Sequence, residues 1–243
     1  MNEVEYERMY EAEQVSWWFR ARRRILNDVI ARLELPSSAS IVDVGCGTGG
    51  NLPMLETHGE VVGVEYSPTG AEFARTRTSC PIVEGSATAT SLDGGAYDLA
   101  TMFDVLEHLE DDVAGLREVH RILKPGGTFL FTVPAFMMLW SAHDVALHHH
   151  RRYRRPKLRK GLEETGFEVD WISYYNTSLF PPVATVRLAR KLVGGGDASA
   201  DGVDVPPKPI NAMLEGLFAV ERHIVGRINL PFGVSLIGVA HKI

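Results

Sequence analysis

Residues 42–51 read VDVGCGTGGN, and this stretch decides the fold. Ile41, Val42 and Val44 have the character of a buried strand, and glycines follow at positions 45, 47, 49 and 50. Glycine accepts positive φ and lets a backbone approach a ligand closely. A strand, a glycine turn and then a helix are how an α/β sheet presents a nucleotide-like ligand at its carboxyl edge.

A second apolar strand ends in Glu65, about twenty residues beyond Asp43. An acid at that place can accept hydrogen bonds from both hydroxyls of a ribose. The glycines read G-x-G-x-G, whereas a dinucleotide fingerprint reads G-x-G-x-x-G and needs a helix N-terminus that receives a pyrophosphate. The pattern therefore departs from that of dinucleotide-binding proteins.

Apolar runs of strand length alternate with helical patterns, which predicts an α/β fold with a mostly parallel sheet and helices on both faces. Lys124-Pro125-Gly126-Gly127 predicts a sharp helix stop and a turn. Helices are expected at 17–34, 50–58, 67–78, 156–165 and 210–227, with another that opens at 111 or 112. Strands are expected at about 40–45, 61–65, 81–84, 97–103, 128–133, 167–174 and 234–241.

Length and composition fit one domain of 243 residues with a net charge of −6. Its expected parts are an N-terminal helical cap (1–36), a binding core (37–176), a cap or insertion (177–230) and a final strand (231–243), with a mobile linker at 194–209. The acidic balance makes nucleic acid an unlikely partner. Two cysteines, Cys46 and Cys80, form no disulfide framework, and the polar N-terminus is no signal peptide, so we expect a cytoplasmic protein.

Asp43, two residues ahead of the first glycine, completes a pattern that resembles motif I of the class I S-adenosylmethionine (SAM)-dependent methyltransferases. YDLATMFDVLEHLED (97–111) and LREVHRILKPGGTFLFTVP (116–134) are similar to later segments of that family, in the same order. The resemblance covers roughly residues 17–175 and 231–243. It implies a Rossmann-like seven-stranded sheet with its last strand antiparallel, SAM as the cofactor and S-adenosylhomocysteine (SAH) as the product.

The resemblance also assigns the cofactor site by position. Glu65 would hold the ribose, Tyr66 would pack on the adenine, and Phe103 and Asp104 would approach the methionyl end. After the third strand the family often has Gly-Asp-Ala, but this chain has Gly-Ser-Ala, so Ser86 or a backbone carbonyl would replace the acid that reads adenine. The cofactor-binding residues expected from the sequence are Asp43, Gly45, Gly47, Gly49, Glu65, Tyr66, Ser86, Ala87, Phe103, Asp104, His108 and Arg20.

Glu107 and His108 follow the fourth strand directly. Methyl transfer is an in-line displacement that needs the acceptor held against the methyl carbon, and a neutral acceptor must also lose a proton. Asp104-x-x-Glu107-His108 resembles a stretch of the quinone-biosynthesis O-methyltransferases where a divalent metal has been linked to the region. These residues therefore have three interpretations, namely a helix cap at the cofactor's edge, a base and a metal ligand; we assign no metal site from the sequence.

HDVALHHHRRY (143–153) is the second group that can serve an acceptor. It looks like a recurring signature of a broad group of bacterial SAM-dependent methyltransferases of mostly unassigned substrate. A His-Asp pair can orient an imidazole as a base, and a run of histidines is also typical of a metal site or a solvated loop. We expect the acceptor here, with His149 or His143 as the base and with Asp144 and His108 as further catalytic candidates.

Trp17-Trp18-Phe19-Arg20 precedes the first strand and is either a lid over the ligands or a helix face packed on the core. Arg20 or Arg24 can pair with the SAM carboxylate or with an anionic acceptor.

Two segments can reach a membrane surface, and the oligomeric state is not readable from the sequence. Residues 151–160 carry seven basic residues and no acid, and are either a solvated helix start or a site for an anionic partner. Residues 179–193 combine an apolar side with a basic edge, and are either a cap helix over the acceptor pocket or a helix that lies on a membrane. The main hypothesis is methylation of an oxygen on a small-molecule acceptor. The alternatives are a membrane-peripheral enzyme that acts on a lipid or lipid-linked glycan, and a non-catalytic SAM-binding protein.

Overall fold

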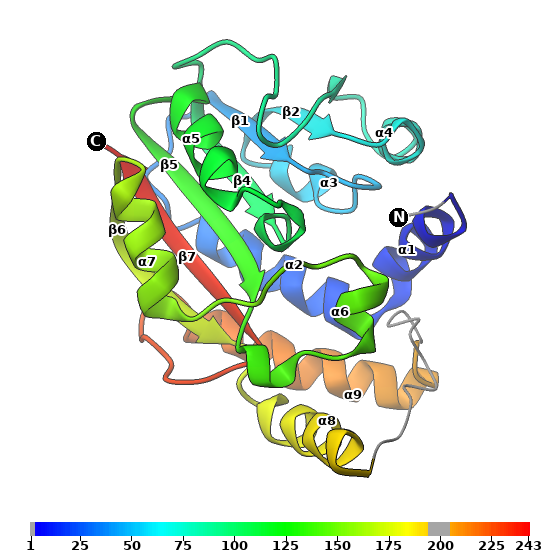
Figure 1. Cartoon of the computed structure of the whole chain (residues 1–243). Helices are drawn as coiled ribbons and strands as arrows, with labels where there is room; N and C mark the ends of the chain where they lie inside the picture. The colour runs from blue at the N-terminus through cyan, green and yellow to red at the C-terminus, as the bar shows by residue number, and fades with distance from the viewer. Residues whose placement is uncertain (1–2, 194–204) are drawn as a thin grey trace.

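A seven-stranded sheet forms the centre of the computed structural model, which describes residues 3–193 and 205–243 (Figure 1). The strand order is β3-β2-β1-β4-β5-β7-β6. Only β7 runs against its neighbours β5 and β6, and the other pairings are parallel, as predicted. The strands are β1 (Ala39–Val44), β2 (Gly59–Glu65), β3 (Ile82–Glu84), β4 (Tyr97–Phe103), β5 (Leu123–Pro134), β6 (Phe167–Tyr175) and β7 (Ser235–Lys242).

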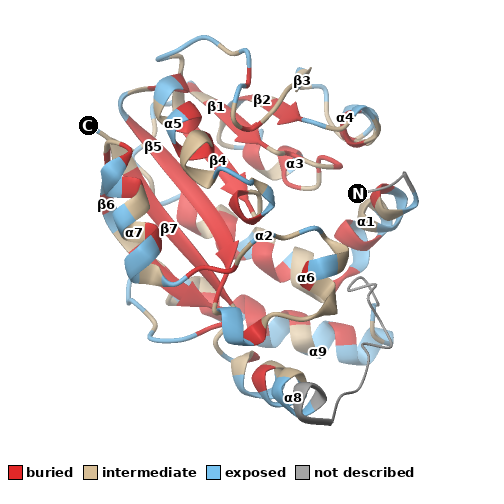
Figure 2. Cartoon of the chain, viewed as in Figure 1, coloured by how far each residue is buried: buried red, intermediate tan, exposed pale blue. Residues whose placement is uncertain are grey.

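Helices cover both faces of this sheet, and Figure 2 shows the buried strands between them. One face packs against α5 (Asp112–Ile122) and α7 (Arg155–Glu164), and the other against α2 (Trp17–Ile30), α3 (Leu52–Leu55) and α9 (Lys208–Ala219). The remaining helices are α1 (Glu3–Val15), α4 (Pro68–Arg75), α6 (Ala142–Ala146) and α8 (Phe180–Val193), with short 3-10 helices η1 (Leu106–His108), η2 (Met137–Leu139) and η3 (Val220–His223).

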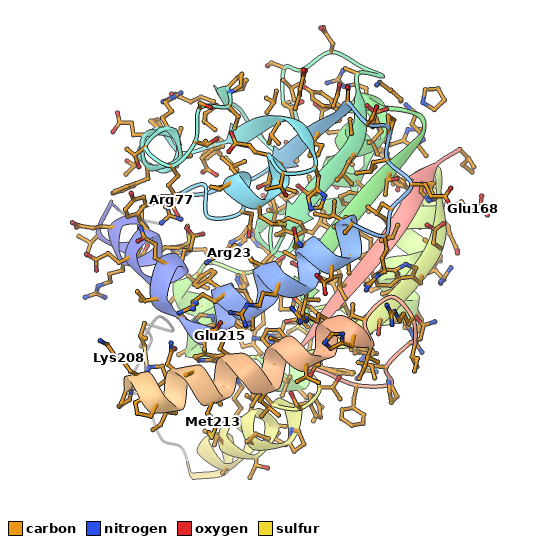
Figure 3. All side chains as sticks on the ribbon, turned by 180° about the vertical axis from the view of Figure 1, so that it is seen from behind. Arg23, Arg77, Glu168, Lys208, Met213 and Glu215 are labelled. Atoms are coloured by element: carbon orange, nitrogen blue, oxygen red, sulfur yellow. The ribbon has the colours of Figure 1, made fainter. Side chains whose placement is uncertain are left out.

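The segment between β6 and β7, which was expected to form a cap, also contributes to the core of the protein. Phe218 of α9 is fully buried, and its ring lies 5.8 Å from that of Tyr175 at the end of β6. Figure 3 shows α9 lying along α2 on the back of the molecule. This segment therefore completes one helical layer of the core, while α8 lies beside η2.

Several element boundaries differ from the sequence prediction. The helix α2 ends at Ile30, and α3 spans only residues 52–55. The helix α5 does stop at Ile122, but the Lys124–Gly127 segment lies within β5 as an irregularity in its pairing with β4, with Gly126 at φ +73°. The helix α1 was not predicted, and the linker expected at 194–209 falls mostly outside the described residues, because α9 begins at Lys208.

Candidate functional site

The glycine turn after β1 needs its glycines. Gly45, Gly47 and Gly49 have φ of +78°, +57° and +80°, which L side chains rarely adopt. A Cβ on Gly45 would lie 2.6 Å from a Val105 methyl, and one on Gly49 would lie 2.9 Å from the Ala74 backbone. The turn is therefore closely enclosed by the segments after β4 and by α4.

Asp43 lies buried at the carboxyl end of β1, in register with Thr101 of β4. Its Oδ1 accepts a hydrogen bond from the Thr101 hydroxyl at 2.6 Å, whereas its Oδ2 has no donor among the described residues. Burial raises the pKa of Asp43 to about 6. The acid therefore lies beneath the turn as a structural support.

Glu65 connects the end of β2 to the glycine turn. Its Oε2 accepts the Gly47 amide at 2.8 Å, and its Oε1 accepts the Ser67 amide at 2.9 Å and the Tyr6 hydroxyl at 3.3 Å. Burial, together with the Glu65 charge, raises the pKa of Tyr6 to about 12, so this hydroxyl stays protonated as a donor. The acid predicted to hold a ribose thus lies at the turn, with one oxygen already engaged by α1.

The helix α1 contacts the same turn, which the sequence did not indicate. The Met9 methyl lies near Gly47, and Glu13 accepts hydrogen bonds from the Thr48 hydroxyl and from Arg77. These contacts place α1 against the binding edge of the sheet (Figure 1).

At the end of β4, Asp104 forms an ion pair with Arg22 of α2, which is only 4% exposed. The Arg22 guanidinium stacks 4.4 Å from the Trp18 ring, and the Phe103 ring centroid lies 5.9 Å from it. Asp104 has φ +57°, so the turn that carries it is strained for a non-glycine residue.

Arg20 and Arg24, the arginines that the sequence suggested for the SAM carboxylate, pair with a different helix and not with Asp104. Both form ion pairs with Glu215 of α9, at 3.2 and 2.7 Å, which places them on the side of α2 that faces that helix. They line a shallow hollow of about 370 Å³ on the outer side of α2. Trp17 lies over Phe218, with ring centroids 6.1 Å apart, which favours the core-packing interpretation of the aromatic run.

The predicted adenine contacts lie at the ends of β2 and β3. Tyr66 is 79% exposed and open for stacking. The Ser86 hydroxyl is 2.9 Å from that of Thr88 and also accepts the Thr88 amide, while Ala87 is buried. Ser86 therefore already has partners within its own turn.

Asp144 organises the loop after β5. Arg152 donates to it twice, at 2.7 and 3.0 Å, and His149 Nδ1 lies 2.9 Å from its Oδ1. Although burial opposes ionisation, the hydrogen bonds from His149 and Arg152 hold the pKa of Asp144 well below its usual range. The Asp144 carboxylate therefore fixes the orientation of the His149 ring through Nδ1, while Nε2 is not engaged by Asp144.

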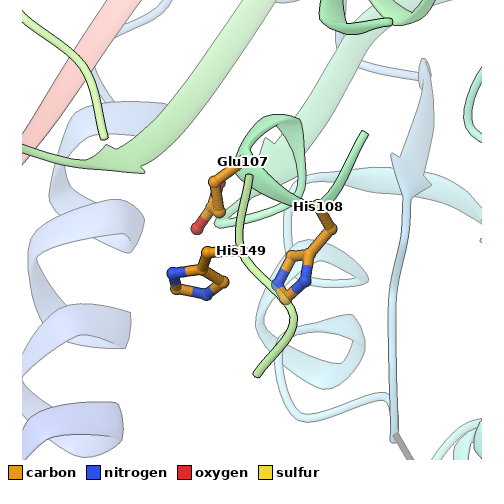
Figure 4. Close-up of side chains that lie close together, drawn as sticks. All are labelled: Glu107, His108 and His149. Carbon is orange, nitrogen blue, oxygen red and sulfur yellow. The ribbon is translucent and has the colours of Figure 1, made fainter. Parts of the chain in front are cut away.

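The same loop is held against η1, since the His150 amide donates to the Glu107 carbonyl at 2.8 Å. This brings Glu107, His108 and His149 together, with one potential ligand atom from each residue within 4.8 Å of the others (Figure 4). The rings of His108 and His149 meet edge to face at 4.6 Å. Glu107 is completely buried, and burial, with the charge of Asp104 adding, raises its pKa well above the usual value.

His143 lies at the edge of this cluster, with its ring 6.4 Å from that of His149. Its Nδ1 is buried without a partner among the described residues, and burial, with Arg187 adding, lowers its pKa to about 4. His148 and His150 are exposed and lie outside the group of three potential ligands.

The basic run 151–160 is largely engaged in ion pairs within the protein. Arg151 pairs with Asp112 at 2.7 Å, and Arg152 is held by Asp144. Arg159 and Lys160 pair with acids one turn along α7. The structure therefore leaves less of this run open to an anionic partner than the sequence suggests.

Fold and site together define an α/β protein that gathers its candidate site residues at the carboxyl edge of a mixed sheet, on both sides of the β1–β4 junction. The family model described as a methyltransferase domain matches residues 18–171, and the chain belongs to this family. Its resemblance to class I SAM-dependent methyltransferases is thereby confirmed.

Two curated relatives illustrate this kinship, and one solved structure shows the same fold. A probable SAM-dependent methyltransferase of Mycolicibacterium smegmatis is 28% identical over 64% of this chain and 61% of its own length. The ubiquinone biosynthesis O-methyltransferase of Xanthomonas axonopodis is 31% identical over 61% of this chain and 70% of its own length. The fold matches a Haloferax volcanii methyltransferase in complex with the Trm112 activator, with a TM-score of 0.61 and 19% identity over 95% of this chain and 91% of the other.

The chain thus spans 61% of the first of these relatives. Among the residues that the structure describes, no helix has the length and apolar character that crossing a membrane requires.

Proposed function

We propose that this protein transfers the methyl group of SAM to an oxygen of a small-molecule acceptor, and that it works in the cytoplasm. The observation that supports the proposal is that the predicted cofactor site and the predicted acceptor site adjoin each other. Asp104, at the predicted methionyl end of the cofactor, is followed within one short turn by Glu107 and His108, which contact the histidine loop. A methyl group at the first site would therefore face an acceptor at the second.

Cofactor binding in this proposal uses the turn, Glu65 and the β4 end. Glu65 would exchange its hydrogen bond with Tyr6 for one with the ribose, and Asp104 would meet the amino group of the methionyl end. Arg22 takes the role that the sequence assigned to Arg20 or Arg24, because it lies buried beside Asp104. A buried guanidinium is well suited to a carboxylate.

The chemistry requires positioning and proton removal. Holding the acceptor oxygen in line with the methyl–sulfur bond supplies several kcal/mol in well-oriented reactions, on the order of 7–11 at most. His149, oriented by Asp144, and His143 are the candidates for taking the acceptor's proton. The relatives support a small-molecule acceptor, since the Xanthomonas protein is named for ubiquinone biosynthesis.

The test is transfer of label from methyl-labelled SAM into fractions of a cell extract, combined with calorimetric titration of SAH. Label in polar small molecules together with SAH binding is the expected result, whereas absence of SAH binding would overturn the proposal. His149→Ala and His143→Ala should each be compared with His150→Ala, an exposed neighbour in the same loop. If both site variants transfer methyl at the normal rate, neither histidine takes part, and if no fraction is labelled although SAH binds, a non-catalytic SAM-binding protein becomes the better description.

A membrane-peripheral enzyme is the second candidate, and one observation favours it. The outer face of α9 is exposed and uncharged beyond Lys208, with Ile210, Met213 and Leu217 at helical spacing, and the exposed Val220 follows at the start of η3. Glu215, the acid within this helix, is buried against α2. An apolar exposed face with a basic start is typical of helices that lie on a lipid surface.

A further inference from the structure

We propose that Glu107, His108 and His149 form a binding site for one divalent transition-metal ion of the Zn²⁺ type, with an open position for the acceptor oxygen. The inference rests on the proposed function for its role in catalysis, but the binding itself can be tested separately. It starts from the way two segments distant in the sequence meet. The three potential ligands come from η1 and from the loop after α6, and their atoms lie within 4.8 Å of one another.

This spacing suits a shared ion. Zn²⁺ binds imidazole nitrogen at about 2.0–2.1 Å and carboxylate oxygen at about 2.0–2.2 Å, so two ligands of one ion lie no more than about 4.4 Å apart. The separations in the structure, all within 4.8 Å, lie at most about 0.4 Å outside this limit, so binding requires only a small closing of the three side chains. Figure 4 shows the two histidine rings and the Glu107 side chain lying close together.

Glu107 supplies an independent observation. Its side chain is completely buried, yet neither of its carboxylate oxygens has a hydrogen-bond donor among the described residues. Native proteins rarely leave a buried carboxylate without a partner, because the desolvation cost is large. A cation between Glu107 and the two histidines provides the missing partner.

The second support is the way His149 is held. Asp144 engages Nδ1, so Nε2 is the atom left for an ion, and Asp144 is itself fixed by Arg152 and by the Ser141 amide at 2.9 Å. A carboxylate that orients a histidine through its second nitrogen is the arrangement usual behind a metal-bound imidazole.

The donor set decides the class of ion. Two imidazoles and one carboxylate favour Zn²⁺, Fe²⁺ or Co²⁺, whereas Mg²⁺ and Ca²⁺ prefer oxygen ligands alone. Three protein ligands with a fourth position open are typical of catalytic rather than structural zinc. Asp104 is not part of this set, because its carboxylate is paired with Arg22.

The site would also alter how the acceptor loses its proton. An oxygen in the open position ionises more readily, as a zinc-bound water does. Its proton then passes to His143 or to solvent, because His149 acts as a ligand. The new carbon–oxygen bond forms as the methyl–sulfur bond breaks, and that bond's electron pair stays on sulfur, which converts the sulfonium into a neutral thioether.

The experiment is titration of chelator-treated protein with Co²⁺, followed by its visible absorption, and with Zn²⁺ by calorimetry. One ion per chain is expected in the wild type and in His150→Ala, the matched control. Glu107→Gln and His149→Ala should bind about 100-fold more weakly, and Asp144→Asn about 10–100-fold more weakly. Unchanged SAH affinity in each variant shows that the fold and the cofactor site are intact.

Two results would overturn the inference: no stoichiometric Co²⁺ binding by the wild type, or equal binding by Glu107→Gln, His149→Ala and the control. Failure of the proposed function is recognised separately, because SAH titration and label transfer are measured on the same samples. Methyl transfer at full rate after chelation, with SAH bound, would remove the ion from catalysis while leaving the methyltransferase proposal in place.

Discussion

The Gly47 amide donates a hydrogen bond to Glu65 Oε2 at 2.8 Å, which ties the glycine turn after β1 to the acid that ends β2. The contact joins two neighbouring strand ends at the edge where the proposed cofactor lies. Glu65 therefore has a structural role, because it stabilises the conformation of the turn, in addition to its proposed role in ligand binding.

Glu65→Ala should therefore lower SAH affinity by at least about 10-fold, since hydrogen bonds to a charged group contribute about 1.5–3 kcal/mol each. Calorimetric titration measures the change. Glu84→Ala is the matched control, because Glu84 ends the next strand but is exposed and pairs with Arg75. Equal SAH affinity in the Glu65 variant and the control would show that Glu65 does not hold the ribose.

Gly49→Ala should destabilise the protein by about 2–4 kcal/mol, because a Cβ at φ +80° would also meet the Ala74 backbone at 2.9 Å. Gly95→Ala separates the two causes. Gly95 has φ +68° but open space around it, so only the backbone strain of about 1 kcal/mol applies. Chemical unfolding of both variants measures the difference, and equal losses would show that the close approach to α4 costs nothing.

Much of the sheet was predictable because strand ends, glycines and acids follow local rules. The seven strand positions and the glycines at positive φ follow from patterns within short windows of the chain, whereas the reversed last strand was implied by the family resemblance. The clustering of Glu107 with His149 was only partly predictable. Both were candidates, but their contact depends on a backbone hydrogen bond between segments 43 residues apart in sequence (150 − 107).

The differences between the sequence predictions and the structure have a common physical cause, which is packing between distant elements. Arg20 and Arg24 were chosen over Arg22 because nothing local shows which side of α2 will meet Glu215 of α9. The helix α1 was missed because its sequence is mostly polar. The spacing of Tyr6, Met9 and Glu13 by three and four residues was the signal for the face that contacts the glycine turn.

Glu118→Gln tests the electrostatics of α5. Hydrogen bonds from Arg121, opposed by burial and aided by Thr90, lower the pKa of Glu118 from 4.5 to about 2. A depressed folded-state pKa stabilises the protein above the unfolded value, and this contribution is lost as the pH falls from about 4.5 toward 2. The variant should lose about 1–2 kcal/mol at pH 7, and the difference should shrink steadily below pH 4.5. Unfolding measured at pH 7 and pH 3 should reveal this, whereas a constant difference would mean that the Glu118 charge is not the cause.

The exposed face of α9 gives the last prediction, which tests the membrane candidate. If Met213 and Leu217 enter a lipid surface, replacing both by Asp should reduce binding to vesicles of anionic and neutral lipid by at least about 10-fold, because burying each side chain contributes on the order of 1 kcal/mol and the new charges oppose insertion. Flotation with vesicles at low salt measures binding. Arg117→Glu is the control, since it makes the same change of two charge units at an exposed position of α5, outside both segments that can reach a membrane. Wild-type protein that ignores such vesicles would exclude the lipid-surface interpretation, and its apolar face would then be left for a protein partner.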